Sequence, residues 1–430
     1  MKLEITNENY SATVVNVNNL VDIGLNTLLA FPIFGLQALV PKTTKLGDKL
    51  LLFPAEVELS REYCKNNNLF RKPELNSDIN SKGYIEENRR IKAIKLGGQY
   101  STALAMPISS LKYLNIDDLK EGDRFNSING VEICKKYEII TKQTRERGNN
   151  IRGLNKKFKR VETKLFPEHL DTGNYLRNQD KIRDNEYIYV SQKLHGSSGR
   201  FGHILINREL SWFEKILKKF NVNIPTTEYG YVAGSRRTVK DVLNENQNHY
   251  YSSDIWNNML DRYKTQIPKN YIIYGEIVGY TPENSMIQKG YTYGQESKTS
   301  ELYVYRVVFM NEDGIGVDLS FPQMKEWCNK NGFKHVAELW RGEHIVFKNS
   351  LDVFTEVNFS DEVRKFIKEG NTGHYWIDDP IDNGVEYPEE GVCIRVDGIT
   401  PYILKMKNQS FLLQETKQLD SGEPDIETEN

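Results

Sequence analysis

The sequence has few cysteines, and none of them form a recognisable pair. The four cysteines lie far apart, with no Cys-x-x-Cys spacing, at Cys64, Cys134, Cys328 and Cys393. Zinc sites and disulfide-stapled domains both need cysteines at short or regular spacings. The sequence supports neither kind of site, and we expect a protein of a reducing, cytoplasmic compartment.

The sequence also lacks a long uninterrupted hydrophobic run. The most apolar N-terminal stretch, Leu25–Val40, is broken by polar residues, a proline and a glycine, and no basic segment with a small-residue cleavage site precedes it. A membrane-spanning helix needs about 20 mostly apolar residues, and a signal peptide needs a basic start and a cleavage site. We therefore expect neither, and no membrane partner.

A net charge of −2 leaves no overall excess of positive charge. Any surface that binds nucleic acid must therefore be local. One segment is strongly basic, and we expect a linker over residues 146–164, either a solvated connection or a strap that contacts phosphates. Around it, nine basic residues stand against Glu146 and Glu162: Lys142, Arg145, Arg147, Arg152, Lys156, Lys157, Lys159, Arg160 and Lys164.

At 430 residues, the chain is long enough for two domains. In residues 1–145 short β-type runs alternate with turn signals, and Gly97-Gly98 joins two of them as a hairpin turn would. We expect a small OB-like β-barrel there, with an insertion at residues 56–87. The β-type runs are residues 12–17, 49–53, 90–96, 99–106 and 134–140.

Residues 165–414 alternate strand and helix patterns, which predicts an α+β domain with antiparallel sheets flanked by helices. The apolar stripe of residues 209–220 predicts a helix packed against the core. Residues 415–430 are strongly acidic, and we expect a disordered tail. The other predicted helices are 252–266, 321–332 and 360–370, and the predicted strands are 271–278, 302–309, 392–396 and 402–406.

An apolar β-type run ends at Lys193, in the sequence Tyr187-Ile-Tyr-Val-Ser-Gln-Lys-Leu-His-Gly196. A lysine is a covalent nucleophile only when its amine is neutral, so such a site must disfavour the ammonium by desolvation or nearby positive charge. Lys-x-x-Gly alone is a weak signal, because Lys95-Leu-Gly-Gly98 matches it too. Only Lys193 heads a series of further motifs.

This series resembles the six motifs of the covalent nucleotidyltransferases, the superfamily of RNA ligases, DNA ligases and capping enzymes. The Lys-x-His-Gly turn and the final Lys-x-Lys-Asn-x-x-Phe motif are more similar to RNA ligases than to DNA ligases. The resemblance runs from about Phe158 to Phe411. After Lys193 the motifs are Ser235-Arg236-Arg237, Tyr274-Gly-Glu276, Leu302-Tyr-Val-Tyr305, Glu390-Gly-Val-Cys-Ile-Arg395 and Lys405-Met-Lys407-Asn-Gln-Ser-Phe411.

The N-terminal half carries a second resemblance. Residues 91–107 resemble the OB domain that precedes the nucleotidyltransferase domain in one branch of nick-sealing RNA ligases. In that reading Lys95 lies on the barrel surface. OB barrels bind oligonucleotides, although they also serve as structural modules.

The resemblance implies two nucleotidyl transfers followed by phosphodiester closure. Lys193 would take AMP from ATP and pass it to an RNA 5′-phosphate, and a 3′-hydroxyl would then displace the AMP. The implied cofactors are ATP, with AMP as the covalent adduct, and Mg²⁺ or Mn²⁺. The implied partner is RNA with 3′-hydroxyl and 5′-phosphate ends, at nicks in a duplex, and we expect a monomer active in RNA repair.

The resemblance also assigns roles to individual residues. Glu276 and Glu390 would hold the metal, since carboxylates are hard oxygen ligands. Lys405 and Lys407 lie two apart, so both side chains leave a strand on the same face, where they would bind phosphates. The nucleotide-binding residues would be Gln192 at the adenine edge, His195 and Gly196 in the turn, Arg236 or Arg237 at the ribose or a phosphate, and Tyr305 stacked on adenine.

His195 is a departure from the pattern, because relatives with an N-terminal OB domain commonly have aspartate at this place. Two alternatives stay open: a DNA ligase, and an OB-fold RNA-binding protein with an inactive transferase domain. DNA ligases and capping enzymes carry another OB domain after the last motif, and the residues that follow Phe411 are too few for one.

Overall fold

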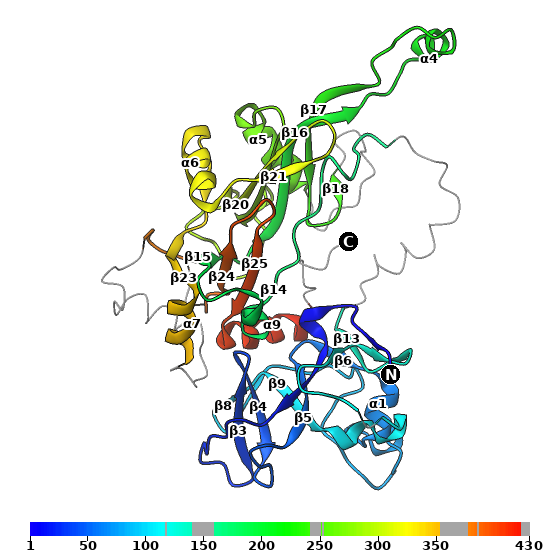
Figure 1. Cartoon of the computed structure of the whole chain (residues 1–430), viewed down its shortest axis with the longest axis vertical. Helices are drawn as coiled ribbons and strands as arrows, with labels where there is room; N and C mark the ends of the chain where they lie inside the picture. The colour runs from blue at the N-terminus through cyan, green and yellow to red at the C-terminus, as the bar shows by residue number, and fades with distance from the viewer. Residues whose placement is uncertain are drawn as a thin grey trace.

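The computed structural model describes residues 1–116, 118–139, 159–240, 251, 253–352, 377–384 and 387–422 (Figure 1). Most of the expected basic linker, the expected helix at 360–370 and the end of the acidic tail lie outside these residues. Within the described part, no helix is long and apolar enough to cross a membrane.

The N-terminal part is built on a six-stranded sheet with the order β10-β2-β5-β9-β4-β3. Its central strand β5 (Lys49–Pro54) is almost wholly buried, because both faces are covered by apolar side chains. β3 and β4 come from the apolar stretch that the sequence excluded as a membrane span. The strands are β10 (Arg124–Phe125), β2 (Ala12–Asn16), β9 (Ala103–Pro107), β4 (Leu36–Pro41) and β3 (Leu28–Ile33).

The pairing between described residues leaves this sheet open at β10 and β3, so the closed barrel expected from the sequence is not observed. The expected hairpin at Gly97-Gly98 is confirmed, with both glycines at positive φ, as its tight turn requires. The remaining elements are β1 (Leu3–Glu4), η1 (Glu8–Tyr10), β6 (Val57–Leu59), α1 (Arg61–Asn66), η2 (Pro73–Leu75), β7 (Ile94–Leu96), β8 (Gln99–Ser101), η3 (Ile108–Leu114), β11 (Ser127–Ile128), β12 (Val131–Glu132) and β13 (Cys134–Lys136).

The C-terminal part contains two sheets, and the expected α+β class with mainly antiparallel sheets is confirmed. The first sheet has the order β14-β25-β24-β15-β23, in which only β14 and β25 pair in parallel. A core of aliphatic residues with Tyr175, Trp340 and Phe347 covers one face of it. Its strands are β14 (Gly173–Asn174), β25 (Tyr402–Lys407), β24 (Gly391–Val396), β15 (Tyr187–Lys193) and β23 (Glu338–Glu343).

The second sheet has the order β18-β17-β16-β19-β20-β21, and β22 joins it beside β20. Helices α5 (Ile255–Tyr263) and α6 (Phe321–Asn331) pack on it, and both form where the sequence predicts helices. Its strands are β18 (Val239–Lys240), β17 (Thr227–Gly234), β16 (Ser197–Asn207), β19 (Tyr271–Gly279), β20 (Ser300–Met310), β21 (Gly316–Asp318) and β22 (Lys334–His335), and the other helices nearby are α3 (Tyr175–Asn178), η4 (Gln179–Lys181), η5 (Lys264–Gln266) and α7 (His344–Asp352).

Helix α4 (Trp212–Lys219) forms where the apolar stripe predicted it, but the prediction that it packs against the core is wrong. None of its residues are buried. It lies at the outer end of the β16–β17 hairpin, away from both sheets (Figure 1). The stripe correctly indicated an amphipathic helix, and only the fold shows that the chain carries this helix away from the body.

Helix α9 (Gln409–Asp420) corrects the expected start of the disordered tail at residue 415. The helix continues because one of its faces is buried, with Phe411, Thr416 and Leu419 on it. Thr416 donates its hydroxyl to Glu56 (2.6 Å), and Arg90 pairs with the same buried carboxylate. The acidic composition of the segment gave no sign of this buried face. Through these contacts, α9 joins the N-terminal part to the end of β25.

Candidate functional site

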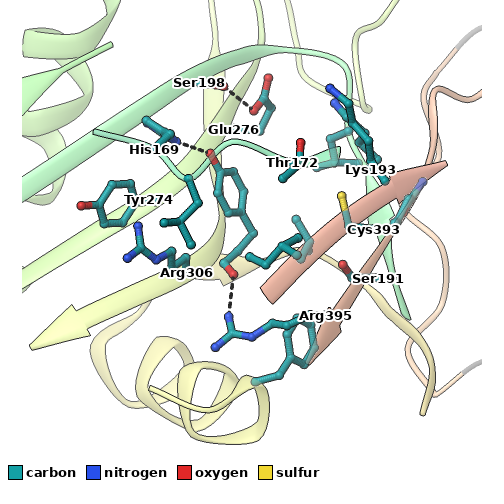
Figure 2. A pocket seen from close by; sticks show the side chains of 18 of the residues that line it. His169, Thr172, Ser191, Lys193, Ser198, Tyr274, Glu276, Arg306, Cys393 and Arg395 are labelled. Atoms are coloured by element: carbon teal, nitrogen blue, oxygen red, sulfur yellow. Dashed lines mark hydrogen bonds between the residues drawn. The ribbon is translucent and has the colours of Figure 1, made fainter. Parts of the chain in front are cut away.

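A pocket opens between the two C-terminal sheets (Figure 2). β15, β24 and β25 supply one wall, while β16, β19 and β20 supply the other. The fold thus brings together residues that are widely separated in the sequence. Six of the residues expected to form the site line it: Gln192, Lys193, Arg236, Glu276, Tyr305 and Lys405.

Lys193 is the last residue of β15, opposite Gly391 of β24. Its Nζ lies 2.7 Å from Oε1 of Glu390, whose side chain is only 1% exposed. A carboxylate this deeply buried must be paired with positive charge, because isolated buried charges are strongly unfavourable. Lys407 adds a second cation, with its Nζ 3.6 Å from the same oxygen and 2.8 Å from Glu415 Oε1.

The turn after Lys193 is held against β19. The Gly196 amide donates to Glu276 Oε1 (3.1 Å), and the Ser198 hydroxyl donates to Glu276 Oε2 (3.3 Å). A Cβ on Gly196 would lie 2.4 Å from the carbonyl oxygen of Ile277, so only glycine permits this approach. Gly196 therefore shapes the turn that sets Lys193 and Glu276 on opposite walls of the pocket.

Three of the expected nucleotide-binding residues are not placed as expected. His195 packs its ring between Tyr291 and Phe411, 3.6 Å from Glu390 Oε2, and does not line the pocket. Gln192 exchanges two 2.8 Å hydrogen bonds with the main chain of Ile381, so its amide is engaged at both ends. Arg237 is exposed.

A second cavity adjoins the pocket at the boundary with the N-terminal part. Arg236, Lys405 and Thr172 line both, whereas Arg237 lines only the second. The N-terminal part contributes residues of η1 and β13, among them Tyr10 and Lys136. The two cavities therefore adjoin at these three residues, and the second, the outer cavity, is lined by both parts of the chain.

The two glutamates proposed as metal ligands offer separate carboxylates. The described residues contain no group of three or more histidine, cysteine, aspartate or glutamate side chains that could hold a metal ion. Mg²⁺ is commonly held by one or two carboxylates together with waters and substrate phosphates. Glu276 and Glu390 fit that manner of binding and do not form an all-protein cage.

His169 is a site residue that the sequence did not identify as functional. Its Nδ1 is hydrogen-bonded to the Tyr305 hydroxyl at 2.7 Å (Figure 2). Desolvation, together with the charges of Arg200 and the neighbouring arginines, lowers the pKa of His169 well below its ordinary value. Burial, and then the charge of Glu276, raises the pKa of Tyr305. Both partners are neutral near pH 7, and they fix the ring that faces the pocket.

The lowered pKa of His169 predicts a pH effect on stability. A histidine whose pKa is lower when folded stabilises the protein above its unfolded pKa of about 6.5, and this contribution is lost as the pH falls below that value, by up to about 1.4 kcal/mol per pH unit. We expect the melting temperature of the wild type to fall more between pH 8 and pH 5 than that of His169→Asn. Parallel curves for the two proteins would contradict the lowered pKa.

A comparison with models of known protein families shows which family the chain belongs to. The family model described as RNA ligase matches residues 186–407, just over half of the chain. The chain belongs to the RNA ligase family. The matched region begins beside β15, which carries Lys193, and ends at Lys407, so it extends from the strand of Lys193 to the paired lysines.

Solved RNA ligases share the fold over nearly the whole length. The Naegleria gruberi RNA ligase with PPi has a TM-score of 0.56 at 16% identity, covering 96% of this chain and 100% of that one. A lysine mutant of that ligase with ATP and Mn has a TM-score of 0.55 at 16% identity, covering 96% and 99%. Another lysine mutant with AMP and Mn has 0.55 at 15%, covering 94% and 98%. No curated protein sequence matches.

Arg395 is a second residue of this RNA ligase whose position the sequence did not reveal. It donates to the main-chain oxygens of Tyr305 (3.4 Å) and Leu319 (2.5 Å), and to Asp397 (2.7 Å). The guanidinium therefore ties β24 to β20 across the floor of the pocket (Figure 2). Its place in the glutamate-to-arginine motif was a signal, but nothing in that spacing identified its partners.

Proposed function

We propose that this protein is an ATP-dependent RNA ligase that works through a covalent lysyl-AMP and seals 3′-hydroxyl and 5′-phosphate ends, at nicks in a duplex. The observation that carries the proposal is the placement of Lys193 in the inter-sheet pocket, 2.7 Å from the buried Glu390. The structures of Naegleria gruberi RNA ligase with ATP or AMP and Mn support the same cofactors here.

The chemistry consists of three displacements at phosphorus. The Lys193 Nζ would attack the α-phosphorus of ATP, forming a P–N bond and releasing pyrophosphate. An RNA 5′-phosphate oxygen would then take the AMP from Lys193. Finally the 3′-hydroxyl would attack the adenylylated 5′-phosphorus, forming the phosphodiester and releasing AMP. Such steps depend mainly on in-line positioning and on neutralising oxygen charge.

The cationic residues suit that task. Lys405 and Arg236 line both cavities, where they would hold the phosphates that extend outward from the adenosine. A divalent ion at Glu276 and Glu390 would supply further positive charge beside the reacting phosphate. Lys193 currently pairs with Glu390. Glu390 would have to exchange this partner for other cations for the amine to react in its neutral form.

Other parts of the proposal concern the setting of the enzyme. We propose that the six-stranded N-terminal sheet is an OB-type module that contacts RNA, and that the basic segment after it contributes to binding. All four cysteines lie within the described residues and none forms a disulfide, which accords with a reducing, cytoplasmic environment. We further propose that the enzyme acts as a monomer.

The direct test uses radiolabelled ATP, then matched nicked duplexes. Incubation with ATP and Mg²⁺ or Mn²⁺ should label the protein, and later addition of nicked RNA should chase the label and produce sealed strands. A matched DNA nick should be sealed much less well. Equal or better sealing of DNA would favour a DNA ligase, and the absence of labelling with both metals would refute the proposal.

The two adjacent arginines should differ in effect. Charge-assisted hydrogen bonds contribute about 1.5–3 kcal/mol, so Arg236→Ala should slow lysyl-AMP formation by roughly tenfold to hundredfold. Arg237→Ala provides the matched control, and it should remain within about threefold of wild type because Arg237 lines only the outer cavity. Single-turnover labelling measures both rates. A larger loss in Arg237→Ala would reverse the assignment.

A further inference from the structure

Helix α4 presents an exposed aromatic surface that no part of the proposed reaction uses. Trp212 is 74% exposed, Phe213 55% and Phe220 77%. Large aromatic side chains are normally among the more buried residues, and a cluster of exposed ones marks a contact surface. The Trp212 and Phe213 rings meet edge to face, with centroids 5.8 Å apart.

The β16–β17 hairpin and α4 form an arm, and local hydrogen bonds hold its tip, residues 208–226. The Ser211 side chain accepts from the Glu214 amide, and the Glu214 side chain accepts from the Ser211 amide, which completes a capping box. Arg208 pairs with Glu214 at 2.7 Å and also donates to the carbonyl of Pro225 (2.9 Å). The helix therefore keeps its shape without packing on the body, so its exposed rings are presented at little further cost in conformational entropy.

Positive charge lies beside the rings. Trp212, Ile216 and Phe220 are four residues apart and form one row along the helix, and Lys215 and Lys219 form the neighbouring row. Lys218 lies on the other side of the helix. Residues 208–226 carry four basic residues against two acidic ones, in a chain whose net charge is −2. The tip is thus suited to an anionic partner that also presents flat apolar groups.

The two strands of the arm start and end beside the pocket. Ser198 near the start of β16 lines the pocket, as does Arg236 just after β17, and the two strands pair from Arg200 to Asn207. At about 3.3 Å per residue, β16 spans roughly 33 Å from Ser197 to Asn207. Figure 1 shows α4 beyond the outer end of this hairpin. The tip is therefore held at a set distance from the place where RNA ends would react.

We infer that α4 is a second RNA-contact site, in which Trp212 and Phe220 stack on unpaired bases while Lys215 and Lys219 contact the adjoining phosphates. The inference rests on the proposed function, because RNA must lie in the pocket for the arm to reach it. Stacking on aromatic rings beside a basic row is how single-stranded nucleic acids are bound without sequence preference. Two copies of this tip would repel each other, since both carry excess positive charge.

The test compares four full-length proteins: wild type, Trp212→Ala with Phe220→Ala, Lys219→Gln, and Lys218→Gln as the matched control on the other face. The RNA probes are nicked duplexes with an unpaired extension on one side, in a short and a long form. The hairpin spans roughly 33 Å. The short extension is chosen to end well within that distance of the nick, and the long one is chosen to reach beyond it.

We expect the aromatic double variant to bind the long probe at least about fivefold more weakly, because each stacked base contributes roughly 1–3 kcal/mol. Its affinity for the short probe and its lysyl-AMP labelling should equal those of wild type. For the long probe, Lys219→Gln should reduce the slope of log affinity against log salt concentration by about 0.7, the value for one lost phosphate contact on a single strand. Lys218→Gln should leave this slope unchanged. The long probe should quench the tryptophan fluorescence of the wild type, and this quenching should be absent from the variant that lacks Trp212.

Unchanged affinity of the double variant for the long probe would overturn the inference, as would equal losses in Lys218→Gln and Lys219→Gln. Phosphatidylserine vesicles that bind wild type but not the double variant, with RNA affinity unaffected, would instead identify a membrane contact. A dimer in sedimentation that the double variant abolishes would identify a second copy. A protein that binds RNA through α4 but forms no lysyl-AMP would refute the proposed function and leave the RNA contact standing.

Discussion

The Lys193→Ala variant is expected to form no covalent AMP adduct. The side chain lost lines the inter-sheet pocket and heads the motif series. Lys407 also lies 3.6 Å from Glu390 Oε1, but it pairs with Glu415 at 2.8 Å and does not line the pocket. The rate should fall below detection, because the proposed nucleophile itself is removed. Gel detection of labelled protein after incubation with radiolabelled ATP measures it.

Lys95→Ala is the matched control for that experiment, since Lys95-Leu-Gly-Gly98 has the same short motif. Lys95 is exposed on β7, its Nζ lies 4.5 Å from the centre of the Tyr100 ring, and it does not line the pocket. Labelling of Lys95→Ala should equal that of wild type. Labelling that persists in a folded Lys193→Ala protein would reject Lys193 as the nucleophile.

Removing either glutamate of the proposed metal site should have the second-largest effect. Glu276→Ala and Glu390→Ala should each slow lysyl-AMP formation by roughly 10²–10³, the usual cost of losing one preorganised electrostatic contact in a transition state. Glu390→Ala should be the worse of the two, because it also leaves Lys193 and Lys407 without their shared buried counter-charge. Single-turnover labelling over a titration of Mg²⁺ and Mn²⁺ measures both.

Glu343→Ala is a suitable control, because this glutamate is exposed at the end of β23 in the same sheet as Lys193. Its labelling rate should equal that of wild type at every metal concentration. A pocket variant whose rate recovers fully with excess metal would point to weakened metal binding alone. A pocket variant that matches wild type throughout would remove that carboxylate from the proposed metal site.

Local patterns in the sequence were sufficient for the elements that form the pocket. The alternation of strand and helix patterns predicted β19, β20, β24 and β25. Because side chains alternate between the two faces of a strand, the spacing also correctly placed Lys405 and Lys407 on one face of β25. The two glycines at residues 97 and 98 predicted their hairpin, because few other residues adopt positive φ at both turn positions. These features depend on neighbours in the chain, and so the sequence alone determines them.

Long-range contacts decided the rest. The His169–Tyr305 bond joins residues 136 apart, and the Gln192–Ile381 pair joins residues 189 apart. Nothing near either residue in the sequence specifies its partner. The same limit explains α4 and α9: periodicity shows that a helix has an apolar face, or hides one under acidic composition, while only the tertiary structure determines whether that face meets the core or solvent. The sequence by itself determined the strand that ends at Lys193 and the order of the motifs, and the packing of distant segments decided which side chains surround Lys193.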